Sequence, residues 1–224
     1  MTTKEPRPRG RPRQFDAEEA VAVAQGLFHA RGYDRVGVEE ISMLLGIRPP
    51  SFYAAFGSKM GLYQRVLERY GSTDAIPLSQ LLRPDAPVAD CLTAVLEEAA
   101  RRYAAHPAAT GCLVLEGTHC TDEDARKAAC DARTAAEHVI HGYIAQRHPE
   151  HAEQLTDFVS TTMSGLSAKA RSGQGVERLL ATARLGGAAI AQLLESGATA
   201  SAKGRLAQER RPANPPKRRT VGPQ

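Results

Sequence analysis

The feature that most constrains the fold is the spacing of the apolar residues, which recur every three or four positions along most of the chain. No stretch of strand length shows the alternation that a half-buried β-strand requires. With 42% apolar and 24% charged residues, the 224-residue chain can also bury a substantial core. The sequence therefore predicts an all-α protein.

Capping signals define the first and fourth helices expected near the amino end. Asp16 is suited to cap a helix that ends at Gly32, because its carboxylate can accept from the first free N–H groups. Ser58 is suited in the same way to cap a helix that runs from Lys59 to about Tyr70. These helices would enclose the segment that carries the most specific motif.

That segment is predicted to hold two short helices joined by a tight turn at Gly46. The first, over 38–45, would bury Ile41, Leu44 and Leu45. The second, over 49–56, opens with two prolines, whose missing N–H groups cost nothing in a first turn. Two such helices form a helix-turn-helix, and the second of them can enter the major groove of DNA.

Charge is concentrated at the two ends of the chain. Residues 1–13 carry five basic side chains and one acidic one, and residues 203–224 carry seven and one, although the net charge of the whole is only +4. Basic ends on an acidic body favour contact with a polyanion, because neutralising phosphates releases condensed counterions. The alternative for each end is a solubilising tail that binds nothing.

The segment from Phe15 to Leu67 resembles the DNA-binding domain of the TetR/AcrR family of bacterial transcriptional regulators. The resemblance lies in an ordered set of short motifs: LF in the first helix, GY at 32–33, the LGI turn, and SFYAAFGSK followed by Leu62. It implies an N-terminal three-helix helix-turn-helix domain followed by a larger helical regulatory and dimerisation domain. The expected divisions are a basic arm over 1–13, a DNA-binding domain over 14–71, an effector-binding and dimerisation domain over 72–200, and a basic disordered tail over 201–224.

The resemblance also implies which residues meet double-stranded operator DNA. The recognition helix would be 49–56, with Arg48 at its start able to reach a phosphate or a guanine edge. Phosphate contacts are expected from the hydroxyl groups of Ser51 and Tyr53 and from the amino group of Lys59 at the start of the fourth helix. The complete expected set is Arg48, Pro49, Ser51, Tyr53, Ala54, Ala55 and Lys59, together with Arg11 and Arg13 of the arm, which could enter the minor groove.

Three positions depart from the family pattern. Ala54 and Ala55 stand where relatives often carry larger side chains, so they can offer only methyl groups to thymine. Gly37 stands where the family usually places Ser or Thr, and glycine caps a helix without supplying a hydroxyl. Packing is the alternative role for Tyr53.

The last two long helices are expected over about 150–172 and 176–195, and the resemblance implies that they form a homodimer as a four-helix bundle. An intrachain hairpin is the alternative. Gly186 and Gly187 in mid-helix suggest a close approach of backbones, since each costs about 1 kcal/mol relative to Ala. The expected interface residues are Phe158, Thr162, Leu166, Leu179, Ala183, Gly187 and Ile190.

The middle of the chain is expected to enclose a pocket for an unidentified small-molecule effector, with Cys91, Cys112, His119 and Tyr143 as candidate lining residues. The GCLV sequence at 111–114 resembles a subgroup of the same family. No cofactor is expected, and no metal, because the spacing of compact zinc sites does not occur. Two alternatives use the same residues: an enzyme with Cys112 as nucleophile and His119 or His138 as base, and a sensor of metals or thiol-reactive compounds.

The resulting hypothesis is a ligand-responsive regulator that represses transcription from a near-palindromic operator until its effector releases it. Residues 68–90 are the expected point of transmission. Activation, and non-specific coating of DNA, remain alternatives. No membrane span or secretory signal is expected, and four cysteines without CxxC spacing suit a reducing cytoplasm.

Overall fold

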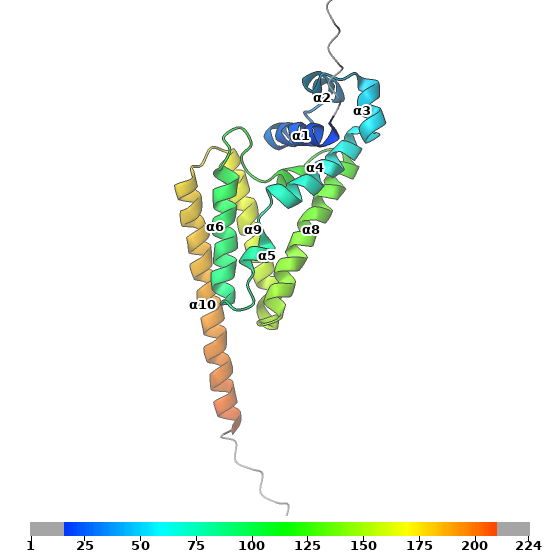
Figure 1. Ribbon diagram of the computed structural model, residues 1–224. Helices are drawn as coiled ribbons and strands as arrows, with labels where there is room; N and C mark the ends of the chain where they lie inside the picture. Colours follow the sequence, from blue (N-terminus) through cyan, green and yellow to red (C-terminus); the bar gives the residue numbers. More distant parts are fainter. Residues whose placement is uncertain (1–15, 210–224) are drawn as a thin grey trace, which may run out of the picture.

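The computed structural model describes the backbone of residues 16–209 and the side chains of residues 16–196. Within these residues every regular element is a helix (Figure 1), in agreement with the predicted class. In chain order the elements are α1 (Ala17–Arg31), α2 (Val38–Leu45), α3 (Pro49–Phe56), α4 (Lys59–Thr73), α5 (Leu78–Leu81), α6 (Val88–Ala104), α7 (Leu113–Gly117), α8 (Glu123–Ala145), the 3₁₀ turn η1 (Pro149–His151), α9 (Ala152–Arg171) and α10 (Val176–Glu209).

Helices α1, α2 and α3, with the start of α4, form a head at one end of the molecule (Figure 1). The predicted caps are confirmed: the Asp16 carboxylate accepts from the backbone of Glu18 and Glu19, and the Ser58 hydroxyl accepts from Gly61 N–H at 2.9 Å. Each side chain satisfies donors that a helix start leaves free. The head therefore has the helix boundaries that its sequence predicts.

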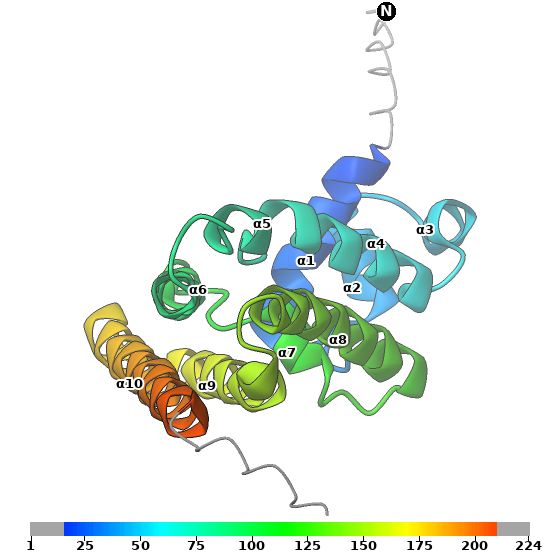
Figure 2. The same cartoon turned by 90° about the horizontal axis from the view of Figure 1, so that it is seen from below.

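The long helices form the body. Helices α6, α9 and α10 run side by side, and α8 lies across from them (Figures 1 and 2). The most extensive packing between any two described elements is that of α10 on α6. Helix α10 thus covers the core of its own subunit along the part nearest the head.

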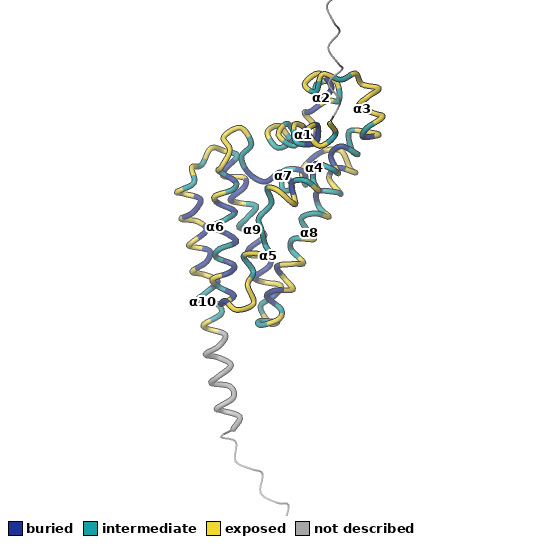
Figure 3. The backbone as a smooth tube through the Cα atoms, in the orientation of Figure 1, coloured by how far each residue is buried: buried dark blue, intermediate teal, exposed yellow. Residues whose placement is uncertain are grey.

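One buried cluster runs from the head into the body (Figure 3). Its largest side chains in the head are Phe28, Phe52 and Tyr63, and the edge of the Tyr63 ring packs on Phe28 with centroids 5.3 Å apart. An added Cβ at Gly117 of α7 would overlap the Tyr63 hydroxyl, so α7 lies directly against α4. The head is therefore seated on the body by shared core packing.

Three features of the fold differ from the sequence predictions. Leu44 is 56% exposed, because Ile41 and Leu45 already fill the inward face of α2. Helix α10 continues to Glu209, past the helix end expected at about residue 195, since 197–209 is rich in helix-forming residues and has no proline. The short elements α5 and η1 were not expected.

No helix in the described part of the chain is long and apolar enough to cross a membrane.

Candidate functional site

The turn between α2 and α3 is held by backbone geometry. Gly46 has φ 65° and ψ 28°, a left-handed conformation that glycine adopts without strain, and Ile47 N–H donates to the Ser42 carbonyl at 3.0 Å. Helix α3 then begins at two prolines and is fixed by Phe52 and Phe56, whose rings are buried with centroids 5.3 Å apart. The opposite face of this short helix is left outward.

That outward face carries most of the residues predicted to meet DNA. Arg48, Pro49, Ser51, Tyr53 and Ala54 are all exposed, with Tyr53 at 51%. Ala55 is half-buried and packs against the core instead. The structure therefore leaves a guanidinium, a hydroxyl and a phenol exposed on this short helix and at its start, where they can contact phosphates and base edges.

Lys59 lies beside this surface, at the seam between head and body. Its Nζ atom stands 3.9 Å from the centroid of the Tyr33 ring. Burial lowers the pKa of Lys59, while the carboxylates of Asp34 and Asp122 act in the opposite direction. The amino group is thus half-buried among residues of the head and the body, and its contact with phosphate stays a prediction.

The sequence reasoning missed one part of this surface and placed another beyond the described residues. Met43 and Leu44 on α2 are 74% and 56% exposed, so two neighbouring apolar side chains face solvent beside the turn that leads into α3. For Met43 the available signal was helical spacing, because it lies two residues from both Ile41 and Leu45 and so on another face. Leu44 had no such signal, since it lies three residues after Ile41. Arg11 and Arg13, predicted for the minor groove, lie outside the described residues.

Two polar junctions join the head to the body. In the first, His29 Nε2 lies 3.0 Å from the Gly111 carbonyl, and Arg171 Nη2 donates to the His29 carbonyl at 2.9 Å. Burial lowers the pKa of His29, which favours a neutral ring there. In the second, Thr121 N–H donates to Asp34 Oδ2 at 2.7 Å. The end of α1 and the loop that follows it are thereby tied to residues of the body.

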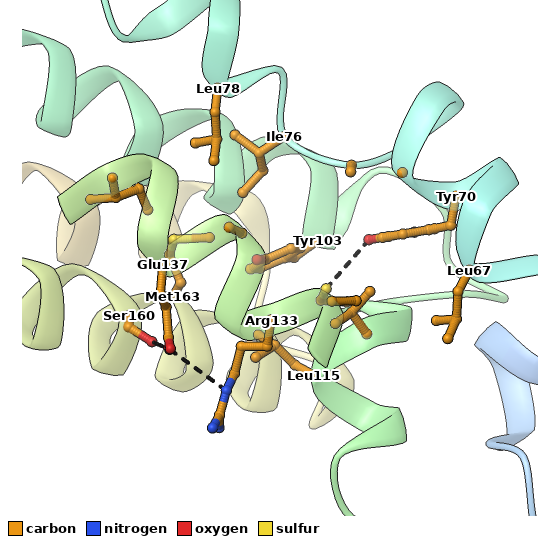
Figure 4. Close-up of a pocket in the computed structure, with 17 residues that line it drawn as sticks. Leu67, Tyr70, Ile76, Leu78, Tyr103, Leu115, Arg133, Glu137, Ser160 and Met163 are labelled. Atoms are coloured by element: carbon orange, nitrogen blue, oxygen red, sulfur yellow. Dashed lines mark hydrogen bonds and ion pairs between the residues drawn. The ribbon is translucent and has the colours of Figure 1, made fainter. Parts of the chain in front are cut away.

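A cavity of about 230 Å³ lies in the body beneath the head. It is lined by the end of α4, the segment that follows it, and α6, α7, α8 and α9 (Figure 4). The lining residues include Leu67, Tyr70, Ile76, Leu78, Tyr103, Cys112, Val114, Leu115, Arg133, Glu137, Ile140, Ser160 and Met163. Tyr70 also lines a second hollow of about 390 Å³ between head and body, together with His29 and Gln25.

Of the four predicted pocket residues, the structure places only Cys112 in this cavity. His119 is exposed. Cys91 and Tyr143 lie together elsewhere, where Tyr143 donates to the Arg83 carbonyl at 2.9 Å and Cys91 Sγ lies 3.7 Å from the same oxygen. These two side chains fix the loop before α6, a contact across 60 positions of sequence that spacing could not predict.

The neighbours of Cys112 do not form a nucleophile–base pair. Cys112 is buried, whereas the two histidines considered as its base, His119 and His138, are exposed. The Sγ atom instead accepts from the Tyr70 hydroxyl at 3.5 Å. No group of three or more residues able to hold a metal occurs among the described residues.

The predicted dimer stripe requires correction. Five of its seven residues are buried within the subunit, because the apolar stripe of α10 covers α6 and that of α9 faces the same core: Leu166, Leu179, Ala183, Gly187 and Ile190. Phe158 is 38% exposed and Thr162 is half-buried. A shallow hollow of about 190 Å³ beside Phe158 is lined also by Ala189 and Leu193, and Leu185, one turn before Ala189, is 73% exposed.

Comparison with known proteins agrees with this geometry. Residues 20–66 match the family described as bacterial regulatory proteins, tetR family. The chain is 54% identical over 195 residues to the HTH-type transcriptional repressor BdcR of Escherichia coli (strain K12), which covers 87% of this chain and 99% of BdcR. It is 26% identical over 183 residues to the HTH-type transcriptional repressor ComR of the same organism, covering 77% of this chain and 87% of ComR.

A solved structure places a similar fold on DNA. The TetR family transcriptional regulator CifR, as a cysteine mutant complexed with 26-bp double-strand operator DNA, matches with a TM-score of 0.73 and 28% identity, covering 80% of this chain and 99% of that one.

Proposed function

Because this chain belongs to the TetR family of bacterial regulatory proteins, we propose that it is a transcriptional repressor that binds operator DNA as a homodimer and is released by a small molecule. Such a repressor acts in the cytoplasm, where the bacterial chromosome lies. The observation that carries the proposal is the outward face of α3, where Arg48, Ser51 and Tyr53 stand exposed on a helix anchored by buried rings.

In this proposal α3 lies in the major groove, and Ser51, Tyr53 and Lys59 contact phosphates. Contacts of this kind fix the position of the head on the duplex, while Arg48 reads a base edge. In a two-fold dimer the two recognition helices would lie about 34–36 Å apart, one turn of DNA, so that the operator is a near-palindrome. The exposed face of α9 and α10, with Phe158 and Leu185, is the surface that we assign to the partner subunit.

Release would follow from the position of α4. Its first residue, Lys59, lies at the DNA side of the head, and its end supplies Leu67, Tyr70 and Gly71 to the cavity. A ligand that moves the end of α4 therefore moves a helix that also carries part of the head. A preference of the ligand for the DNA-incompetent state by 1–3 kcal/mol would weaken operator binding about 5- to 150-fold.

The test is selection of fragments of the host genome by the full-length protein, followed by footprinting. We expect protection of a near-palindrome with half-sites one helical turn apart. Arg48→Ala should weaken binding by about 1–3 kcal/mol and relax base preference at one position of each half-site. Lys127→Ala on α8, where the side chain is 74% exposed, is the matched control and should bind as the wild type does. Equal affinity for random and selected duplexes would refute the proposal.

A further inference from the structure

We infer that the ligand of the cavity beneath the head is an uncharged, mostly apolar molecule of one- or two-ring size that accepts a hydrogen bond from Tyr70. This inference deepens the proposed function, since it names the chemical class of the effector. It depends on the size of the cavity, the pairing of its charges and the donors at one end.

The size of the cavity limits the ligand. A dry cavity of about 150 Å³ lined by apolar side chains can hold benzene. The cavity here is about 230 Å³, so it suits a substituted benzene or a two-ring compound. Most of its wall is aliphatic or thioether surface from five helices and a loop: Leu67, Ile76, Leu78, Val114, Leu115, Ile140 and Met163.

The charges in the lining are already paired with each other. Arg133 and Glu137 are its only charged residues, and Arg133 Nε lies 3.6 Å from Glu137 Oε1, which makes an ion pair without a hydrogen bond. The Ser160 hydroxyl also donates to Glu137 (Figure 4). An ionic ligand would have to give up its hydration without an unpaired opposite charge to meet, and that cost is large in an apolar cavity. The lining therefore favours a neutral molecule.

Hydrogen-bond donors occupy the end of the cavity nearest the head. The Tyr70 hydroxyl donates to Cys112 Sγ at 3.5 Å, and a thiol sulfur is a weak acceptor. Burial raises the pKa of Tyr70 and of Tyr103 far above neutrality, so both phenols keep their protons. A carbonyl oxygen is a stronger acceptor than the thiol, and a ligand that brings one would take the Tyr70 hydrogen bond from Cys112.

Such an exchange acts directly on the head. The Tyr70 ring also meets His29 of α1 edge-on, with ring centroids 5.7 Å apart. The His29 ring nitrogen in turn contacts the carbonyl of Gly111, the residue before Cys112. A ligand that turns the Tyr70 side chain therefore disturbs the first polar junction between head and body.

The experiment measures binding of four probes of similar size to the full-length protein by calorimetry: acetophenone, isopropylbenzene, benzoate and benzylammonium. We expect acetophenone to bind most tightly, isopropylbenzene more weakly, and the two ions not at all. Tyr70→Phe should weaken acetophenone about 2- to 10-fold and leave isopropylbenzene unchanged, because only the former uses the hydroxyl. Ala136→Leu, which fills part of the cavity, should abolish binding of both neutral probes.

Tighter binding of either ion, or an equal loss of both neutral probes in Tyr70→Phe, would overturn the inference. So would release of DNA by thiol-reactive compounds alone, abolished by Cys112→Ser. Operator affinity without any probe is measured in parallel. If the operator binds and the neutral probes do not, the ligand class is wrong and the repressor proposal stands; if no duplex is selected, the repressor proposal itself fails.

Discussion

At the scale of single residues, Lys59 decides whether the seam beside α3 contributes to DNA binding. Its Nζ atom lies over the Tyr33 ring in the free protein, and a phosphate would compete with that ring for it. We expect Lys59→Ala to lower the affinity for all duplexes equally. The slope of log affinity against log salt concentration should become shallower by about 1. Binding isotherms at several salt concentrations measure both quantities. An unchanged slope would show that Lys59 makes only the Tyr33 contact.

Asp34 gives the second prediction at this scale. The hydrogen bond from Thr121 N–H lowers the pKa of Asp34 below its usual value. Because the folded-state pKa lies below that of the unfolded chain, the carboxylate adds stability above the unfolded pKa of about 4. That contribution is lost as the pH falls through the folded value.

Asp34→Asn keeps an acceptor oxygen but removes the charge. Its loss of stability at pH 7 should be small, a few tenths to about 1 kcal/mol, because the side chain is exposed. Denaturant unfolding from pH 7 to pH 3 is the measurement, and the difference between wild type and variant should disappear in the acid range. A constant difference would mean that the Asp34 charge plays no part in the junction.

At the scale of helices, the sequence predicted starts and ends far better than partners. Asp16, Gly46 and Ser58 act within a few residues of their own position, so local rules locate them. The packing partner of a helix face is different. An apolar stripe shows that something packs on the face, but it does not show whether the partner is the same chain or another subunit. The stripe of α10 was assigned to a partner subunit, and most of it covers α6.

Gly187 shows this packing at its tightest. An added Cβ would overlap the Thr93 hydroxyl of α6 and lie 2.9 Å from Thr93 Cβ, so rotation of that side chain cannot relieve it. We expect Gly187→Ala to destabilise the protein, by about 1–3 kcal/mol, although alanine is the better helix former.

Gly142→Ala is the matched control, since nothing lies within 4 Å of a Cβ at that position in α8. It should raise stability by up to about 1 kcal/mol. Thermal unfolding of both variants gives the comparison. A gain in stability from both substitutions would mean that α10 and α6 are not in close contact at residue 187.

At the scale of the whole molecule, the sequence predicted a DNA-binding head, a helical body and a pocket, but not the cavity wall. Three of the four proposed pocket residues lie elsewhere, because a cavity wall is made by residues far apart in the chain that no periodicity connects. The region 68–90 is the exception: it was expected to transmit the signal, and Tyr70, Ile76 and Leu78 from it line the cavity.

Assembly gives the last prediction. Leu185 is 73% exposed on α10, on the same face as the hollow beside Phe158, whereas an interior leucine of this helix such as Leu179 is fully buried. A large apolar side chain at the centre of an interface often contributes 2 kcal/mol or more, and a carboxylate there would also be desolvated without a partner. Leu185→Glu should therefore raise the dimer dissociation constant by at least about 30-fold.

Val139→Glu is the control for this substitution, because Val139 is 52% exposed on α8, away from the hollow. Sedimentation equilibrium should give a monomer for Leu185→Glu at concentrations where Val139→Glu and the wild type are dimers. Operator affinity should fall with it, because two linked heads bind far more tightly than one. If both variants remain dimers, the interface does not include this face of α9 and α10. If both become monomers, the interface includes α8 as well.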